Sequence, residues 1–256
     1  MHLLLFGGTG MVGTEVLHLA LADPRISHVT TVGRRRTAVV HKRLTEITCA
    51  DMLDLSTVEP QLREADLIVY CLGVYQNAVS AAEFWTITCG YLEQLLGRLT
   101  QIGADPVFCL MGAQGADPNE RTPFRFGKAK GRAERFLTES QLTKKYIFRP
   151  GYIMPGQGKS RSTVPEWISR PLFRLFPALG IEAVNLAKVM IETGLTRPAK
   201  VLYTNGEMRE IAGSLLRSSG WARREWARGR WTRSGTPFHR TPTLPTCCLR
   251  PPGAPE

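Results

Sequence analysis

The chain has 256 residues, of which 43% are apolar and 21% are charged, and its formal net charge is +11. A chain of this length and composition can bury a substantial core without disulfides or metals, which argues against a small disulfide-stapled or metal-dependent domain. No apolar run approaches the length of a bilayer-spanning helix, and the first strand begins at once without room for a signal peptide, so we expect a cytoplasmic protein with no transmembrane segment.

The chain opens with a short buried strand that leads into a glycine turn. Apolar residues 3–6 precede the turn, and a helical pattern follows it to about residue 22. Glycine permits a tight turn and a close backbone approach, and a helix N-terminus offers free N–H groups to an anion. The spacing G-x-x-G-x-x-G departs from the dinucleotide fingerprint G-x-G-x-x-G, so an ordinary strand-to-helix turn stays open as the alternative. We predict a pyrophosphate site at Gly7, Thr9, Gly10, Met11, Val12 and Gly13.

A second strand is expected at residues 28–33, and three consecutive arginines follow it. In NAD-binding proteins a carboxylate at this point holds the ribose 2′-hydroxyl, and here it is missing. A guanidinium instead binds a 2′-phosphate with paired hydrogen bonds. Arg34 and Arg35 therefore predict that NADP(H) is favoured over NAD(H), with a solvated basic turn as the alternative.

The remaining chain alternates strands and helices. Further strands are expected at 45–49, 66–71, 105–110, 145–148 and 200–204, and helices at 80–101, 128–143 and 183–195. This order predicts an α/β fold, a Rossmann-like doubly wound parallel sheet, as a single NAD(P)-binding domain at residues 1–213. Ligands of such sheets bind at the carboxyl ends of the strands, which makes the segments after the strands candidate sites.

Three of these segments supply candidate contacts to the cofactor. Asp51 and Met52 follow the third strand, where a carboxylate can accept the adenine amino group. Cys71, Leu72 and Gly73 follow the fourth strand, where glycine permits close contact with a ribose. Pro150 and Gly151 follow the sixth strand.

Together with the glycine turn, these segments resemble the atypical short-chain dehydrogenase/reductase superfamily. More narrowly, Gly115-Ala116-Asp117 and Lys130-Gly131-x-x-Glu134 resemble the NAD(P)H-binding branch that contains Tat-interacting-protein-type oxidoreductases. The resemblance extends from residue 1 to about residue 212. It implies the fold and the cofactor more specifically than it implies an activity.

The catalytic positions depart from this family. Active members carry Tyr-x-x-x-Lys, in which the tyrosine transfers a proton and the lysine lowers its pKa and holds the nicotinamide ribose. The matching residues here are Phe126 and Lys130, and Gly112 stands where a serine hydroxyl is expected. We expect Lys130 to be retained for the cofactor and to be the remaining catalytic candidate, with an exposed helix charge as its alternative. Carbonyl oxidoreductase activity is therefore expected to be weak, altered or absent.

Two segments stand apart from the regular alternation. Residues 152–180 combine a Gly/Ser/Lys/Arg-rich stretch with apolar positions, which fits a lid over the nicotinamide, a subunit contact or a membrane-surface helix. Residues 214–256 contain eight arginines, no lysine, three tryptophans and no valine or isoleucine, and we predict a disordered basic tail. Nucleic-acid binding rests on this tail alone and is disfavoured.

The remaining residue types leave the ligand unidentified. The six cysteines form no C-x-x-C pair and the five histidines show no ligand spacing, so we expect buried free thiols and no metal. An unidentified small-molecule substrate or ligand is expected. A nucleotide-sensing regulatory protein without catalysis, with a homo-oligomeric or protein partner, stays open beside the enzyme.

Overall fold

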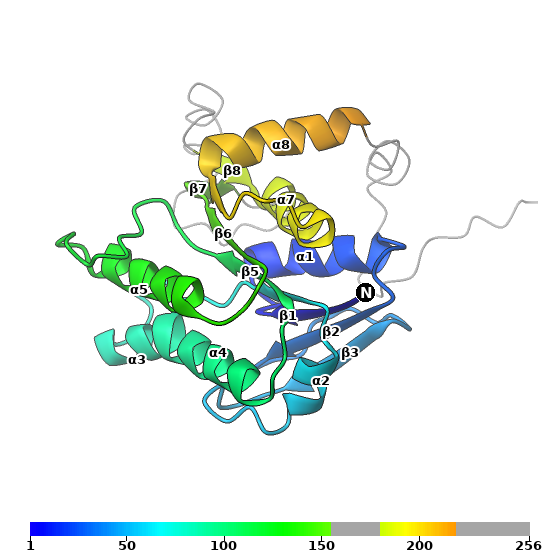
Figure 1. Cartoon of the computed structure of the whole chain (residues 1–256), viewed down its shortest axis with the longest axis horizontal. Helices are drawn as coiled ribbons and strands as arrows, with labels where there is room; N and C mark the ends of the chain where they lie inside the picture. Colours follow the sequence, from blue (N-terminus) through cyan, green and yellow to red (C-terminus); the bar gives the residue numbers. More distant parts are fainter. Residues whose placement is uncertain (155–179, 219–256) are drawn as a thin grey trace, which may run out of the picture.

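The structure is a computed structural model that describes residues 1–154 and 180–218. Its main sheet has seven strands in the order β3-β2-β1-β4-β5-β6-β9, and every neighbouring pair is parallel (Figure 1). The strands are β1 (His2–Phe6), β2 (His28–Gly33), β3 (Leu44–Thr48), β4 (Leu67–Tyr70), β5 (Val107–Met111), β6 (Lys145–Arg149) and β9 (Leu202–Thr204). The predicted Rossmann-like α/β fold is confirmed.

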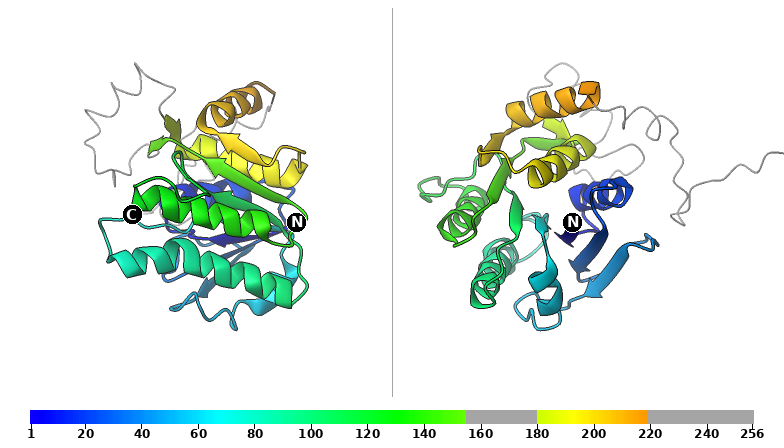
Figure 2. Two further views of the ribbon diagram at one scale, coloured as in Figure 1. Left: turned by 60° about the vertical axis from the view of Figure 1, so that its left-hand side comes forward. Right: turned by 45° about the vertical axis from the view of Figure 1, so that its right-hand side comes forward.

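Helices cover both faces of this sheet (Figure 2). They are α1 (Met11–Ala22), α2 (Glu59–Glu64), α3 (Ala81–Trp85), the π-helix η1 (Thr86–Gly90), α4 (Tyr91–Gln101), α5 (Arg125–Glu139), α7 (Ala183–Thr196) and α8 (Asn205–Ser218). A second, two-stranded parallel sheet pairs β7 (Tyr152–Met154) with β8 (Gly180–Glu182).

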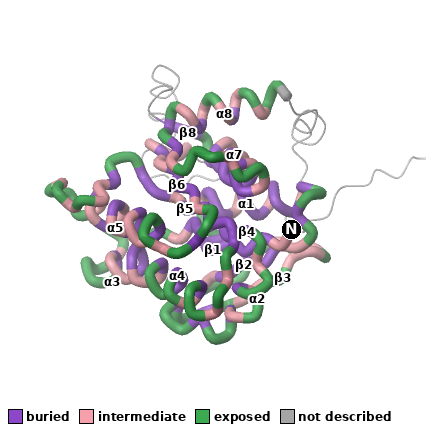
Figure 3. The backbone as a smooth tube through the Cα atoms, viewed as in Figure 1, coloured by how far each residue is buried: buried purple, intermediate pink, exposed green. Residues whose placement is uncertain are grey.

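The core has two large apolar layers, one on each face of the sheet, and a small third cluster of Phe84, Cys89 and Ala129. Leu3 and Leu5 of β1 belong to the layer that contains α1 and α7, whereas Leu4 and Phe6 belong to the layer that contains α2 and α4. Successive side chains of a strand point to opposite faces, so a strand buried on both faces reads as an unbroken apolar run. The buried backbone tube in the middle of Figure 3 follows these strands.

The order of the strands indicates where on the sheet a ligand would bind. The chain passes from β1 to β2 and β3 on one side and then returns to β4 on the other side of β1. Adjacent crossovers that leave in opposite directions create a crevice at the carboxyl ends of β1 and β4. The glycine turn and the Cys71–Gly73 segment meet at this switch point.

Several predicted boundaries need correction. The helix expected at 80–101 is divided into α3, η1 and α4, and the helix expected at 128–143 begins at Arg125 and ends at Glu139. Helix α8 continues to Ser218, so residue 213 lies inside a helix, where Ser214 Oγ donates to the Ile211 carbonyl at 2.8 Å. Residues 155–179 of the expected cover and 219–256 of the expected tail lie outside the described residues.

Two further observations concern the described part of the chain. Cys49, Cys71, Cys89 and Cys109 are buried free thiols, as expected. Among residues 1–154 and 180–218, no helix combines the length and apolarity needed to cross a membrane, and no group of three His, Cys, Asp or Glu side chains is arranged for a metal ion.

Candidate functional site

The glycine turn brings the start of α1 close to the ends of β1 and β4. Gly7 has a φ of +88°, and a Cβ on it would lie 2.9 Å from the backbone carbonyl of Cys71. A Cβ on Gly13 would lie 2.1 Å from the Gly7 oxygen. Gly10 N–H donates to that same oxygen at 3.0 Å. Larger residues would therefore push the helix away from the strand ends.

The first turn of α1 is arranged for an anion. Its N-cap is Gly10, which has no side chain to bind the free N–H groups. Thr9 is exposed and Met11 is half-buried, whereas Val12 is only 3% exposed and packs in the core. Val12 can therefore reach a phosphate through its backbone N–H, not its side chain.

The three arginines after β2 are exposed to solvent. Arg34, Arg35 and Arg36 are exposed, and among the described residues no hydrogen bond or ion pair engages their guanidinium groups. Their position at the carboxyl end of β2 puts them beside the strand that carries the glycine turn. This is a cationic segment whose binding capacity is not used inside the described fold.

The candidates after β3 and β4 differ in what they can offer. Asp51 is exposed, and its Oδ1 accepts the Leu53 N–H at 2.9 Å, which leaves the other carboxylate oxygen for a ligand. Met52 and Cys71 are only 2% and 6% exposed, so a contact from either would come from the backbone. Burial raises the pKa of the Cys71 thiol to about 12, which keeps it protonated and unreactive. Leu72 is half-buried and Gly73 is exposed beside it.

The Lys130 side chain reaches the carboxyl ends of the central strands. Its Nζ donates to the Met111 carbonyl at 3.3 Å and lies 3.9 Å from where a Cβ on Gly73 would stand. Burial lowers the pKa of the Lys130 ammonium, and the Glu134 carboxylate opposes this shift. Lys130 thus connects the last residue of β5 with the segment after β4, which an exposed helix charge would not do.

A buried ion pair lies under this lysine, and sequence reasoning did not identify it. Glu134, one turn after Lys130 on α5, is 1% exposed on its side chain and binds Arg149 with a 2.5 Å contact between Oε2 and Nη2. A second contact joins Arg149 Nε to the same oxygen at 3.0 Å. Burial raises the pKa of the Glu134 carboxyl and Arg149 counteracts it. The signals in the sequence were the Lys-Gly-x-x-Glu motif and the arginine that ends β6.

The same carboxylate fills the space beside Gly112. A Cβ on Gly112 would lie 2.5 Å from Glu134 Oε1 and 3.1 Å from the Phe148 carbonyl. A serine therefore cannot be placed at this position without moving the ion pair. Phe126 supplies no proton either, because its ring carries no hydroxyl. The half-buried ring packs against Phe84, with the ring centroids 6.5 Å apart.

The segment after β6 is fixed by neighbours from two elements. Gly151 N–H donates to Asn205 Oδ1 at 3.0 Å, and the Pro150 carbonyl accepts the Gln114 N–H at 2.8 Å. Asn205 begins α8 and is 6% exposed. The loops after β5 and β6 are thereby joined where a nicotinamide end would lie, and Asn205 is a residue that the sequence did not indicate.

Comparison with known proteins gives concordant results. Residues 3–127 match the NAD dependent epimerase/dehydratase family. The mitochondrial protein FMP52 of Coccidioides immitis is 24% identical over 75% of this chain and 84% of its own length, and HTATIP2 of Rattus norvegicus is 25% identical over 68% and 70%.

Solved structures share the fold. The Bordetella bronchiseptica enzyme WbmH, in complex with NAD+, superposes with a TM-score of 0.62 at 13% identity over 84% of this chain and 80% of its own. A short chain dehydrogenase from Burkholderia cenocepacia, in complex with NADP, gives 0.61 at 13% identity over 85% and 93%. Both forms of pyridine nucleotide thus occur among proteins with this architecture.

Proposed function

Because the chain belongs to the atypical short-chain dehydrogenase/reductase superfamily and has its pyridine-nucleotide-binding fold, we propose that it binds NADP(H) in preference to NAD(H). The pyrophosphate lies on the glycine turn and the first turn of α1. The 2′-phosphate lies against Arg34 and Arg35. The nicotinamide ribose lies near Lys130 and the Pro150–Gly151 segment.

The observation that carries this proposal is the exposed arginine segment at the end of β2. Arg34 and Arg35 have no protein partner among the described residues, and no carboxylate follows β2 to hold a ribose 2′-hydroxyl. A dianionic phosphate gains charge-assisted hydrogen bonds from guanidinium groups that a hydroxyl cannot match. NADH, which lacks this phosphate, gains nothing from the pair.

We propose weak or altered carbonyl chemistry at the other end of the site. The nucleotide supplies hydride when bound, and the chain must place a proton donor opposite it. Lys130 can hold the ribose, but Phe126 has no proton, and the Glu134–Arg149 pair occupies the space of a hydroxyl at residue 112. Loss of general acid catalysis alone lowers a rate by roughly 10²- to 10⁴-fold.

The missing phenol also favours a second candidate, a nucleotide-sensing regulatory protein. Such a protein needs the cofactor site and a partner surface and performs no turnover. Binding of NADPH together with undetectable reduction of a panel of aldehydes and ketones would favour the sensor, whereas rapid cofactor-stoichiometric reduction would contradict both the weak-activity proposal and the sensor.

Binding measured by calorimetry tests the cofactor assignment. The wild-type chain is expected to bind NADPH more tightly than NADH, and the double variant Arg34→Asp with Arg35→Ala is expected to lose roughly 100-fold in NADPH affinity. Affinity for NADH should change little. Lys42→Ala, which removes an exposed cation before the start of β3 and so away from the carboxyl ends of the strands, is the control. Equal affinity of the wild type for both nucleotides would overturn the proposal.

A further inference from the structure

We infer that Glu46 is a positioning residue for cofactor choice, which holds the arginine segment over the glycine turn and so sets the preference for NADP(H). This inference rests on the proposed function, because it explains how the arginines are kept in place. It concerns an acidic residue of β3 that contacts no part of the proposed cofactor site directly in the described structure.

Glu46 fixes the residue that follows the arginines. Its Oε1 accepts the Thr37 backbone N–H at 2.6 Å and the Thr37 hydroxyl at 2.6 Å. Two hydrogen bonds to one ionised oxygen are stronger than neutral ones and define an orientation. Glu46 lies opposite Thr31 in the β2–β3 register, so its carboxylate is anchored to the sheet.

Thr37 in turn lies against the glycine turn. Its methyl group is 3.4 Å from where a Cβ on Gly8 would stand, and the Thr31 methyl is 3.2 Å from the same point. The threonine therefore packs between β3 and the phosphate-binding turn. A contact of this kind couples the position of the loop to the position of the turn.

The arginines are consequently tethered at both ends. On one side the Gly33 carbonyl accepts the Cys49 N–H at 3.0 Å, and on the other side Thr37 is bound by Glu46. Only Arg34, Arg35 and Arg36 lie between these fixed points. When a phosphate binds, this short tethered segment loses less conformational entropy than a free loop would lose, which raises affinity without adding a contact.

Charge and position make opposite predictions for the conservative variant. If Glu46 acts by position, Glu46→Gln keeps an acceptor oxygen for Thr37 and preserves the preference. If the carboxylate instead repelled the 2′-phosphate, the same substitution would tighten NADPH binding. Glu46→Ala removes both charge and acceptor and releases the loop.

The experiment measures dissociation constants of NADPH and NADH for the full chain with wild-type sequence, Glu46→Ala, Glu46→Gln and Arg34→Ala with Arg35→Ala. We expect Glu46→Ala to weaken NADPH by about tenfold and NADH by less than about twofold, and Glu46→Gln to stay within about threefold of wild type for both. Glu64→Ala, which removes an exposed carboxylate before the start of β4, is the matched control. Thermal unfolding of each variant verifies that it is folded at the temperature of measurement.

The outcomes separate the inference from the function beneath it. Equal losses for NADPH and NADH in Glu46→Ala, or tighter NADPH binding in Glu46→Gln, overturn the positioning role. If the double arginine variant retains the NADPH preference, the proposed function itself fails. If that variant loses the preference but Glu46→Ala keeps it, the arginine site stands and the inference alone is wrong.

Discussion

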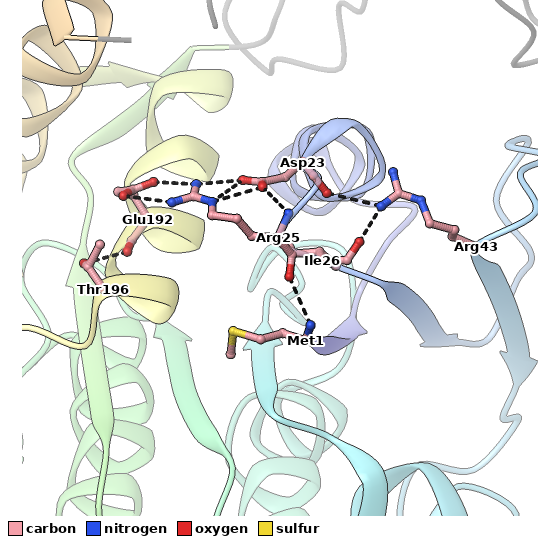
Figure 4. Close-up of polar contacts among 7 residues, drawn as sticks. All are labelled: Met1, Asp23, Arg25, Ile26, Arg43, Glu192 and Thr196. Carbon is pink, nitrogen blue, oxygen red and sulfur yellow. Dashed lines mark hydrogen bonds and ion pairs between the residues drawn. The ribbon is translucent and has the colours of Figure 1, made fainter.

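Arginines lie at both ends of the parallel strands, and their surroundings differ. We call the side of the sheet where the strands begin the amino edge and the side where they end the carboxyl edge. At the amino edge, Arg25 and Arg43 are surrounded by acceptors from neighbouring elements (Figure 4). At the carboxyl edge, Arg34 and Arg35 are exposed and engage no partner among the described residues. The contrast shows that the surroundings, and not the residue type, decide whether a guanidinium is engaged by the fold or stays exposed to solvent, where it can meet a ligand.

The amino edge is closed by a network. Arg25 Nη2 binds Asp23 Oδ2 at 2.7 Å and Glu192 Oε2 at 2.8 Å, which connects the turn after α1 with α7. These hydrogen bonds raise the pKa of the Arg25 guanidinium, with that to Asp23 contributing most. Arg43 donates to the carbonyls of Leu21, Asp23 and Ile26. An arginine so engaged has few donors left for a ligand.

The largest effect is expected from a substitution in the close contact between α1 and the glycine turn. Gly13→Ala would place a Cβ 2.1 Å from the Gly7 oxygen and should destabilise the fold by about 3 kcal/mol or more, with loss of nucleotide binding. Denaturant unfolding measures the change. Gly97→Ala in α4, where nothing lies within 4 Å of the new atom, is the control and should be neutral or slightly stabilising. Unchanged stability of Gly13→Ala would contradict the close packing.

A smaller and more selective effect is expected at the amino edge. Arg25→Ala leaves Asp23, which is 4% exposed, without its cation and should lower the free energy of unfolding by about 2 kcal/mol, a value reduced because Arg25 itself is half exposed. Nucleotide affinity should be unchanged once the variant is folded. The pair of Arg63 with Glu59 gives the comparison, because the Arg63 side chain is 54% exposed and Glu59 keeps Arg98 as a second partner, so Arg63→Ala should shift the free energy of unfolding by less than about 0.5 kcal/mol. A loss of affinity in Arg25→Ala without a loss of stability would remove the distinction between the edges.

The smallest effect concerns pH and again the amino edge. Burial and the neighbouring His28 lower the pKa of His2, and burial together with Arg43 and Lys42 lowers the pKa of His41. Protonation is therefore easier in the unfolded chain, so this contribution is present above the ordinary histidine pKa of about 6.5 and is lost as pH falls below it. Thermal unfolding between about pH 7.5 and pH 5.5 should show a weaker acid sensitivity in a His2→Gln, His41→Gln variant than in wild type. Identical pH profiles would contradict the shifts.

Local patterns in the sequence predicted the parts of the molecule that are built from consecutive residues. The run from Leu3 to Gly13 predicted a buried strand, a tight turn and the start of a helix. The three arginines were recognisable because they directly follow the second strand. Pairs formed across the fold could not be predicted in the same way. The motif that contains Glu134 and the position of Arg149 were visible in the sequence, but Glu134 and Arg149, like Glu46 and Thr37, meet only once the sheet is assembled. Likewise, helical periodicity at 80–101 does not distinguish an α-helix from one interrupted by a π-turn such as η1.

The contact between Gly112 and Glu134 makes the effects of substitutions here depend on their order. A side chain at residue 112 requires the Glu134 carboxylate to move or to be replaced by a smaller group, and either change disturbs the ion pair with Arg149. Each single step is therefore unfavourable while the combination relieves the clash, which is the condition for strong non-additivity between neighbouring sites. A hydroxyl at residue 112 is therefore expected to be tolerated better together with a compensating change at Glu134 than alone, because the cost of each substitution depends on the state of the other site.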